Sequence, residues 1–242
     1  MRSWAAAALD LLFPAICPAC RAPLGAGRRD PLCGMCWTAI VRITPPWCET
    51  CGLPFLTFAA PPAPGGVPER CAACVAIPPP WDYARAAAQY VDPLRLALGA
   101  FKFQGRRALA RPLAGLLVEQ CGPALPADVE VLVPVPLGRA RERERGFNQA
   151  ALLAEGVARA LDRPARHWLG RTRATRPQSD LGAAERRANV RDAFQARSVV
   201  AGRHVVVVDD VLTTGATVAE CARVLREAGA RAVGVLTVAR VV

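Results

Sequence analysis

Residues 204–217, HVVVVDDVLTTGAT, constrain the fold more than any other part of the chain. Four consecutive valines with strong β propensity come first, and Asp209 and Asp210 follow them directly. A short run that is apolar on both faces is typical of a strand inside a parallel sheet covered by helices. A helical pattern of apolar residues then runs from Val218 to Ala228. The stretch therefore predicts a buried strand that ends in two carboxylates, a small-residue loop and a helix.

The loop between this strand and the helix is suited to binding an anion. It consists of Thr213, Thr214, Gly215, Ala216 and Thr217, which offer hydroxyls, backbone N–H groups and a glycine that admits close approach. The positive end of the helix dipole favours negative charge, and ligands of parallel sheets bind beyond the carboxyl ends of the strands. A phosphate in the loop with sugar hydroxyls on the acids describes a sugar phosphate. The alternative is an ordinary strand–turn–helix with solvated acids.

In its order of residues, the stretch resembles the phosphoribosyl-pyrophosphate (PRPP) signature of type I phosphoribosyltransferases. The resemblance implies that Asp209 and Asp210 are the catalytic acids, which reach the ribose hydroxyls directly or through Mg²⁺. It also implies that loop 213–217 wraps the 5-phosphate. Purine-salvage relatives carry an acid in this loop where the present chain has Thr213. This difference argues against purine salvage and leaves no evident general base.

Eight of the ten cysteines form four C-x-x-C pairs, which predict metal binding. The pairs are Cys17/Cys20, Cys33/Cys36, Cys48/Cys51 and Cys71/Cys74. Twelve residues separate the first two pairs and nineteen separate the last two, which suits two structural zinc sites of four cysteines each. We expect tandem sites, in which pair 1 joins pair 2 and pair 3 joins pair 4, and a cross-brace of pairs 1 with 3 and 2 with 4 is the alternative. Disulfides, a redox motif and iron–sulfur binding are the alternatives.

The composition favours a reduced, cytoplasmic protein with anionic partners. The net charge is +11 over 242 residues, and the 52% of hydrophobic residues argues against disorder. Only one of the 31 basic residues is a lysine, Lys102, so a lysine at that position stands out. No stretch is long enough to insert into a membrane, and Asp10 interrupts the apolar N-terminal run, which we interpret as a short leading helix, Ser3–Phe13.

Alternating strand and helix patterns after the triple proline at 78–80 predict an α/β domain with a parallel sheet flanked by helices. We therefore expect a leading helix and double zinc ribbon in residues 1–80 and the larger domain in residues 81–242. Strands are expected at 84–91, 129–135, 165–170 and 232–238, and further helices from 93, at 108–121 and around 152–161.

Basic motifs near the expected strand ends are candidates for the pyrophosphate side of the site. They are Lys102 in the sequence FKF, Arg139, and Arg145 in the sequence RGFNQ. Residues 171–194 form a long basic stretch with a short helical piece at 183–189. This stretch is either a lid over a charged substrate or a surface insertion.

Taken in order, the four C-x-x-C pairs, FKF, VPVP, RGFNQ and the acid-threonine stretch resemble the ComF family of ComFC-like and GntX-like proteins. The resemblance covers almost the whole chain. It implies a double zinc ribbon fused to a type I phosphoribosyltransferase-like domain that binds PRPP with Mg²⁺. It also implies, in some bacteria, a role in natural transformation.

Three functions follow as hypotheses. The first is a PRPP-dependent transferase with an unknown acceptor, and the second is a non-catalytic PRPP-sensing protein that acts through partners. The third is a DNA-binding zinc protein in which the sugar-phosphate pocket is vestigial. The macromolecular partners expected are single-stranded DNA or a competence helicase-type protein. The oligomeric state is left open by the sequence.

Overall fold

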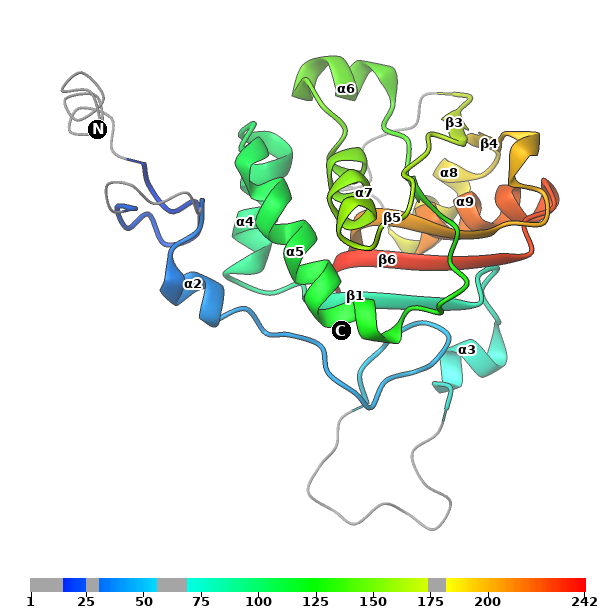
Figure 1. Ribbon diagram of the computed structural model, residues 1–242, viewed down its shortest axis with the longest axis horizontal. Helices are drawn as coiled ribbons and strands as arrows, with labels where there is room; N and C mark the ends of the chain where they lie inside the picture. The colour runs from blue at the N-terminus through cyan, green and yellow to red at the C-terminus, as the bar shows by residue number, and fades with distance from the viewer. Residues whose placement is uncertain (1–14, 25–30, 56–68, 174–181) are drawn as a thin grey trace, which may run out of the picture.

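The computed structural model describes residues 15–24, 31–55, 69–173 and 182–242. A four-stranded parallel sheet with the strand order β1-β6-β5-β2 forms its centre (Figure 1). The strands are β1 (Tyr83–Gln89), β2 (Val131–Pro134), β5 (His204–Leu212) and β6 (Ala232–Arg240). The expected parallel sheet flanked by helices is confirmed. The leading helix predicted at Ser3–Phe13 lies outside the described residues.

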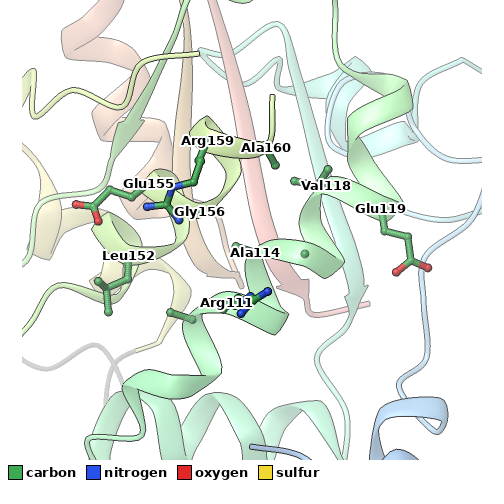
Figure 2. Close-up of a pocket in the computed structure, with 11 residues that line it drawn as sticks. Arg111, Ala114, Val118, Glu119, Leu152, Glu155, Gly156, Arg159 and Ala160 are labelled. Carbon is green, nitrogen blue, oxygen red and sulfur yellow. The ribbon is translucent and has the colours of Figure 1, made fainter. Parts of the chain in front are cut away.

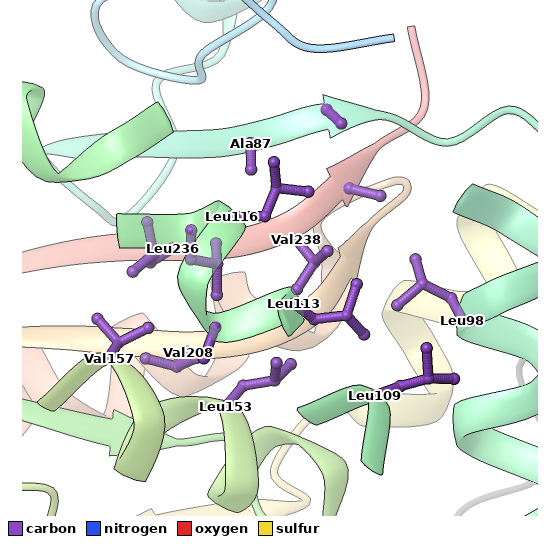
Figure 3. Close-up of a cluster of buried hydrophobic side chains, with 14 of the residues drawn as sticks. Ala87, Leu98, Leu109, Leu113, Leu116, Leu153, Val157, Val208, Leu236 and Val238 are labelled. Carbon is purple, nitrogen blue, oxygen red and sulfur yellow. The ribbon is translucent and has the colours of Figure 1, made fainter. Parts of the chain in front are cut away.

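Strand β5 is central and buries both of its faces, because helices pack on each side of the sheet. Val206 and Val208 point into one core and Val205 and Val207 into another, as the alternation of side chains along a strand requires. The first core is closed by α4 (Leu94–Phe103), α5 (Ala110–Cys121) and α7 (Gln149–Ala160) (Figure 3). The second is closed by α8 (Ala183–Val190) and α9 (Ala216–Glu227). Removal of these side chains from water stabilises the layered arrangement.

The connections between these elements contain short helices and a small second sheet. They are η1 (Arg107–Leu109), η2 (Gly122–Ala124), α6 (Arg139–Arg145), η4 (Ser198–Val200), β3 (Leu169–Arg171) and β4 (Phe194–Ala196). The predicted strand at 165–170 is shifted in the structure. Ala165 makes only one parallel bridge to Leu132, and the chain then pairs antiparallel with β4 from Leu169. Helix α8 matches the helical piece predicted in the long basic stretch, of which residues 174–181 lie outside the described residues.

The cysteine-rich region lies along the β1 edge of the sheet and contains α2 (Gly34–Thr38) and α3 (Ala72–Ala76) (Figure 1). Ile43 N donates to Ala87 O at 3.0 Å, and Gln89 N donates to Val41 O at 2.8 Å. Arg85 is 8% exposed, and its guanidinium donates to the Glu49 carboxylate at 2.6 Å. An edge strand that would otherwise present unpaired backbone groups is thereby covered. Within the described ranges, no helix is long and apolar enough to cross a membrane.

Candidate functional site

Asp209 and Asp210 lie in the part of β5 that pairs with β6 but no longer with β2. Pairing with β2 ends at Val208, whereas pairing with β6 continues to Leu212. The prediction that the strand ends at the acids is therefore wrong: β5 continues through Asp209 and Asp210 because β6 extends equally far. On the β2 side, Pro136 follows soon after the last pair and cannot donate a ladder hydrogen bond. The carboxyl end of β5 is consequently open along one edge.

The pleat of β5 places the two carboxylates on opposite faces of the sheet. Asp210 shares the face of Val208 and points toward α4, where Lys102 Nζ lies 2.9 Å from Asp210 Oδ1. Asp209 Oδ1 instead accepts a hydrogen bond of 2.9 Å from the backbone N–H of Asp210. Asp210 is 3% exposed, and its Oδ2 is buried without a hydrogen-bond partner. An unpartnered buried carboxylate oxygen fits a cation or hydroxyl ligand, because such an atom is otherwise costly.

Burial and the neighbouring charges shift the pKa values of Asp209 and Lys102. Burial, followed by the negative charge of Asp210, raises the pKa of Asp209 to about 7. Burial by itself lowers the pKa of Lys102, but the Asp210 carboxylate outweighs burial and the net pKa is raised. Below about pH 7 the raised pKa favours the protonated form of Asp209, and a bound cation would lower that pKa again.

The loop after β5 turns sharply into α9 through a glycine in the left-handed region. Gly215 has φ +75° and ψ 1°, and it is the N-cap residue of α9, which begins at Ala216. The helix starts two residues earlier than the apolar periodicity at Val218 predicts, because the left-handed glycine allows the chain to enter the helix at once. Thr213 and Thr214 are exposed beside the first N–H groups of the helix. This arrangement is suited to a phosphate.

The three basic residues predicted for the pyrophosphate side, Lys102, Arg139 and Arg145, do not all lie near the acids. Arg145, at the end of α6, stacks on the ring of Phe103 with 5.4 Å from its Cζ to the ring centroid. Burial lowers the pKa of Arg145, while the Asp210 carboxylate opposes this effect. Arg139 is exposed on the first turn of α6. The structure therefore brings Lys102 and Arg145 toward the acids and leaves Arg139 at the surface.

The sequence motifs FKF and RGFNQ form one wall beside the acids. Phe101 and Phe147 pack with ring centroids 5.5 Å apart, whereas Phe103 is 78% exposed. Asn148 caps α7 by accepting from Ala150 N at 2.9 Å. Its Nδ2 also donates to the carbonyl of Val135, just beyond β2, at 3.0 Å. The RGFNQ turn is thus fixed to the open end of the sheet.

The eight paired cysteines gather into two groups of four. Within each group the four Sγ atoms lie within 4.8 Å of one another, and the groups are Cys17/Cys20/Cys33/Cys36 and Cys48/Cys51/Cys71/Cys74. Measured Sγ–Sγ distances are 3.6 Å for Cys20–Cys33 and 3.7 Å for Cys51–Cys71. Four thiolates around a tetrahedral zinc at about 2.3 Å would stand about 3.8 Å apart. The geometry fits zinc, and the groups follow the tandem pairing rather than the cross-brace.

A groove of about 610 Å³ lies on the outer side of α5 and α7, away from this chemistry (Figure 2). Small residues create it, and a β-carbon at Gly156 would stand 2.6 Å from Ala114 Cβ. Arg111, Glu155 and Arg159 flank it. None of the candidate site residues, all of which are described, lines this groove.

Sequence reasoning missed two residues that connect the site to the cysteine-rich region. Trp81 lies against Gly215, and Arg240 donates to the carbonyl of Cys51. Trp81 is the first residue of the expected larger domain. The triple proline just before it marks the entry into the domain, but no local pattern indicates which loop the ring contacts.

Comparisons with known proteins agree with this architecture. The Double zinc ribbon domain matches residues 8–75, and the Phosphoribosyl transferase domain matches residues 148–241. The DNA utilization protein YhgH of Escherichia coli O157:H7 is 37% identical over 95% of this chain and 99% of its own length. Competence protein F of Haemophilus influenzae is 33% identical over 93% of this chain and 96% of its own. Competence protein ComFC of Bacillus subtilis is 36% identical over 60% of this chain and 58% of its own. The chain therefore belongs to the ComF family, in which a double zinc ribbon precedes a phosphoribosyltransferase domain.

Proposed function

We propose that this chain binds PRPP together with Mg²⁺ at the carboxyl end of β5. The observation that carries the proposal is the acid pair at an open strand end, followed by a glycine-capped helix N-terminus. In this proposal Thr213, Thr214, Gly215, Ala216 and Thr217 enclose the 5-phosphate, and Asp209 and Asp210 bind the ribose hydroxyls. The phosphoribosyl transfer domain match over residues 148–241 supports this interpretation.

The donor set of the acid pair suits Mg²⁺, a cation that prefers carboxylate oxygens and substrate phosphates. Asp209 and the unpartnered Oδ2 of Asp210 would hold it. When bound, Mg²⁺ supplies charge neutralisation for a departing pyrophosphate. Lys102 and Arg145 would add positive charge on the same side, and Arg139 would reach the pyrophosphate from the exposed turn of α6.

Binding can be tested by calorimetry with PRPP and Mg²⁺ on the zinc-loaded full-length chain. The double variant Asp209→Asn/Asp210→Asn should lose about 100-fold or more in affinity, because two charge-assisted contacts disappear. Asp162→Asn is the matched control: Asp162 is exposed after α7 with φ 51°, a conformation that asparagine tolerates. Equal affinities of the double variant and the wild type would refute the proposal.

Transfer to an acceptor is a further step of the same proposal. The protein would position the ribose carbon for attack and neutralise charge, since the loop holds Thr213 instead of an acid that could act as a base. Release of pyrophosphate should be measured across a panel of purine and pyrimidine bases. If PRPP binds and no base in the panel raises the rate of pyrophosphate release above the rate without a base, the non-catalytic PRPP-sensing function is favoured.

Single-stranded DNA handling is the second candidate, and the exposed basic helix α6 beside the exposed ring of Phe103 favours it. Aromatic stacking combined with basic side chains is typical of single-strand binding. Fluorescence anisotropy with labelled oligonucleotides should show an affinity that falls with salt. Arg139→Ala/Arg143→Ala should weaken it. An interaction that is absent or independent of salt would exclude this function.

The names of the similar proteins support a link to DNA use and competence, which we carry over as part of the proposal.

Within the same proposal, we assign residues 1–80 to metal binding and residues 81–242 to PRPP binding. We also assign the protein to the cytoplasm, where the eight clustered cysteines would stay reduced. A competence helicase-type protein is the proposed partner, and co-purification with a tagged chain tests it.

A further inference from the structure

Trp81 connects the second cysteine cluster to the loop that precedes α9. Its indole Nε1 donates a hydrogen bond of 2.9 Å to the carbonyl of Thr50, which lies between Cys48 and Cys51. The far end of the ring lies against Gly215, where a β-carbon would stand 3.1 Å from Trp81 Cη2. Only 9% of the residue is exposed. One buried ring therefore bridges the Cys48–Cys51 turn and the loop that precedes α9.

Arg240 makes a second connection between the same two regions. Its guanidinium Nη1 donates to the carbonyl of Cys51. Within the sheet, Arg240 pairs with Leu212, the last residue of β5, and Val241 N donates to Leu212 O at 3.0 Å. The second cluster therefore also holds the strand end from which the loop departs.

The segment that carries these two carbonyls has little apolar packing of its own. Its small core consists of Cys48, Cys51 and Cys74, with Leu53, Phe55 and Cys71 packed against it. Cys71 N donates to the sulfur of Cys48 at 3.3 Å, so a ligand atom also orders the backbone. Metal binding supplies the folding free energy of modules built in this way. The positions of the Thr50 and Cys51 carbonyls therefore depend on the metal.

The first cysteine cluster offers an internal comparison. Cys17 and Cys36 belong to the core on the α5 face of the sheet, whereas Trp81 and Ala216 belong to the core on the α9 face. Both clusters have the same four-sulfur geometry, and within the described residues the hydrogen bonds that Trp81 and Arg240 donate end on the Cys48–Cys51 turn of the second cluster. Loss of metal from the two sites should have different consequences.

We propose that the second cysteine cluster controls the order of loop 213–217, with Trp81 as the positioning residue between them. Metal in this cluster fixes Thr50 and Cys51, these hold Trp81 and Arg240, and the ring supports Gly215 in its left-handed conformation. Loss of this metal would loosen the loop and weaken the binding of a phosphorylated ligand. Only the ligand part of this inference rests on the proposed function.

Amide hydrogen exchange of loop 213–217 tests the coupling without any ligand. Cys71→Ser removes one ligand of the second cluster, and Cys20→Ser is the matched variant of the first. Cys71→Ser should raise the exchange rate of the loop about tenfold or more, while residues 205–208 of β5 stay protected. Cys20→Ser should leave loop exchange within about twofold of the wild type. Zinc content, measured on the same samples, should fall by one ion in each variant.

Trp81→Phe keeps an aromatic ring in the core but removes the indole Nε1, which donates to Thr50, and the far edge of the ring, which lies against Gly215. It should raise loop exchange about tenfold or more, because both contacts are lost, with zinc content unchanged. Calorimetry with PRPP and Mg²⁺ should show a parallel loss of affinity in Trp81→Phe and Cys71→Ser. Unchanged loop exchange in both variants, or an equal effect of Cys20→Ser, would overturn the coupling. If the wild type does not bind PRPP, the proposed function fails, whereas loop exchange still decides the coupling.

Discussion

Lys102 Nζ lies 2.9 Å from Asp210 Oδ1, so the single lysine of the chain is an ion-pair partner of a site acid. The alternation of β5 turns Asp210 toward α4, and the last turn of α4 delivers the ammonium group. Lysine is a compact point charge on a flexible stem, which reaches a buried carboxylate that a planar guanidinium would fit poorly. In the ligand-free protein, Lys102 neutralises one carboxylate oxygen and Asp210 Oδ2 is left without a hydrogen bond.

We predict that Lys102→Met destabilises the fold, because it leaves the Asp210 carboxylate buried and unpaired. The expected loss in the free energy of unfolding is about 2–4 kcal/mol, measured by urea denaturation at pH 7.5. The double variant Lys102→Met/Asp210→Asn should regain most of this loss, since no buried charge remains. A double variant as unstable as the single one would show that the lysine acts through packing alone.

The raised pKa of Asp209 predicts a specific dependence of stability on pH. Between about pH 4 and pH 7 the folded chain keeps a proton on Asp209 that the unfolded chain has released, so stability falls as the pH rises through this window. Asp209→Asn lacks this titration. The free energy of unfolding of the wild type minus that of the variant should therefore be larger at pH 5 than at pH 7.5. A difference that is the same at both pH values would contradict the raised pKa.

Gly215→Ala should weaken PRPP binding by more than its loss of folding stability explains. The residue has φ +75°, and the new β-carbon would also press on Trp81 Cη2 at 3.1 Å. Gly202→Ala is the matched control, because Gly202 has φ +73° with no neighbouring atom within 4 Å. Each variant should lose about 1 kcal/mol of stability from backbone strain. Only Gly215→Ala should weaken PRPP binding, by about tenfold or more, and equal binding by the two variants would exclude a role for the loop.

The tandem pairing of the cysteines predicts how zinc content responds to paired substitutions. The wild type should hold two zinc ions per chain by elemental analysis, in keeping with the two cysteine groups. Cys20→Ser/Cys33→Ser alters one group and should retain about one ion, whereas Cys20→Ser/Cys51→Ser alters both and should retain about none. A cross-brace would give the reverse result.

Local patterns predicted much of this molecule from the sequence. The valine run predicts a strand buried on both faces, and the C-x-x-C spacing predicts pairs of metal ligands. Both predictions succeed because each pattern depends on residues close together in the chain. Helix α8 was likewise anticipated near its observed position. The start of α9 was missed by two residues, since the left-handed conformation of Gly215 is not encoded in apolar periodicity.

Tertiary structure alone decided which distant groups meet. The length of β5 beyond Asp209 depends on β6, and the ion pair of Lys102 depends on where α4 packs. The tandem grouping of cysteines and the contact of Trp81 with Gly215 depend on how the cysteine-rich region covers the edge of β1. By itself the sequence determined the chemistry of each segment. The packing of segments remote in the chain determined which side chains share a site, because that packing follows from burial over the whole fold and not from local spacing.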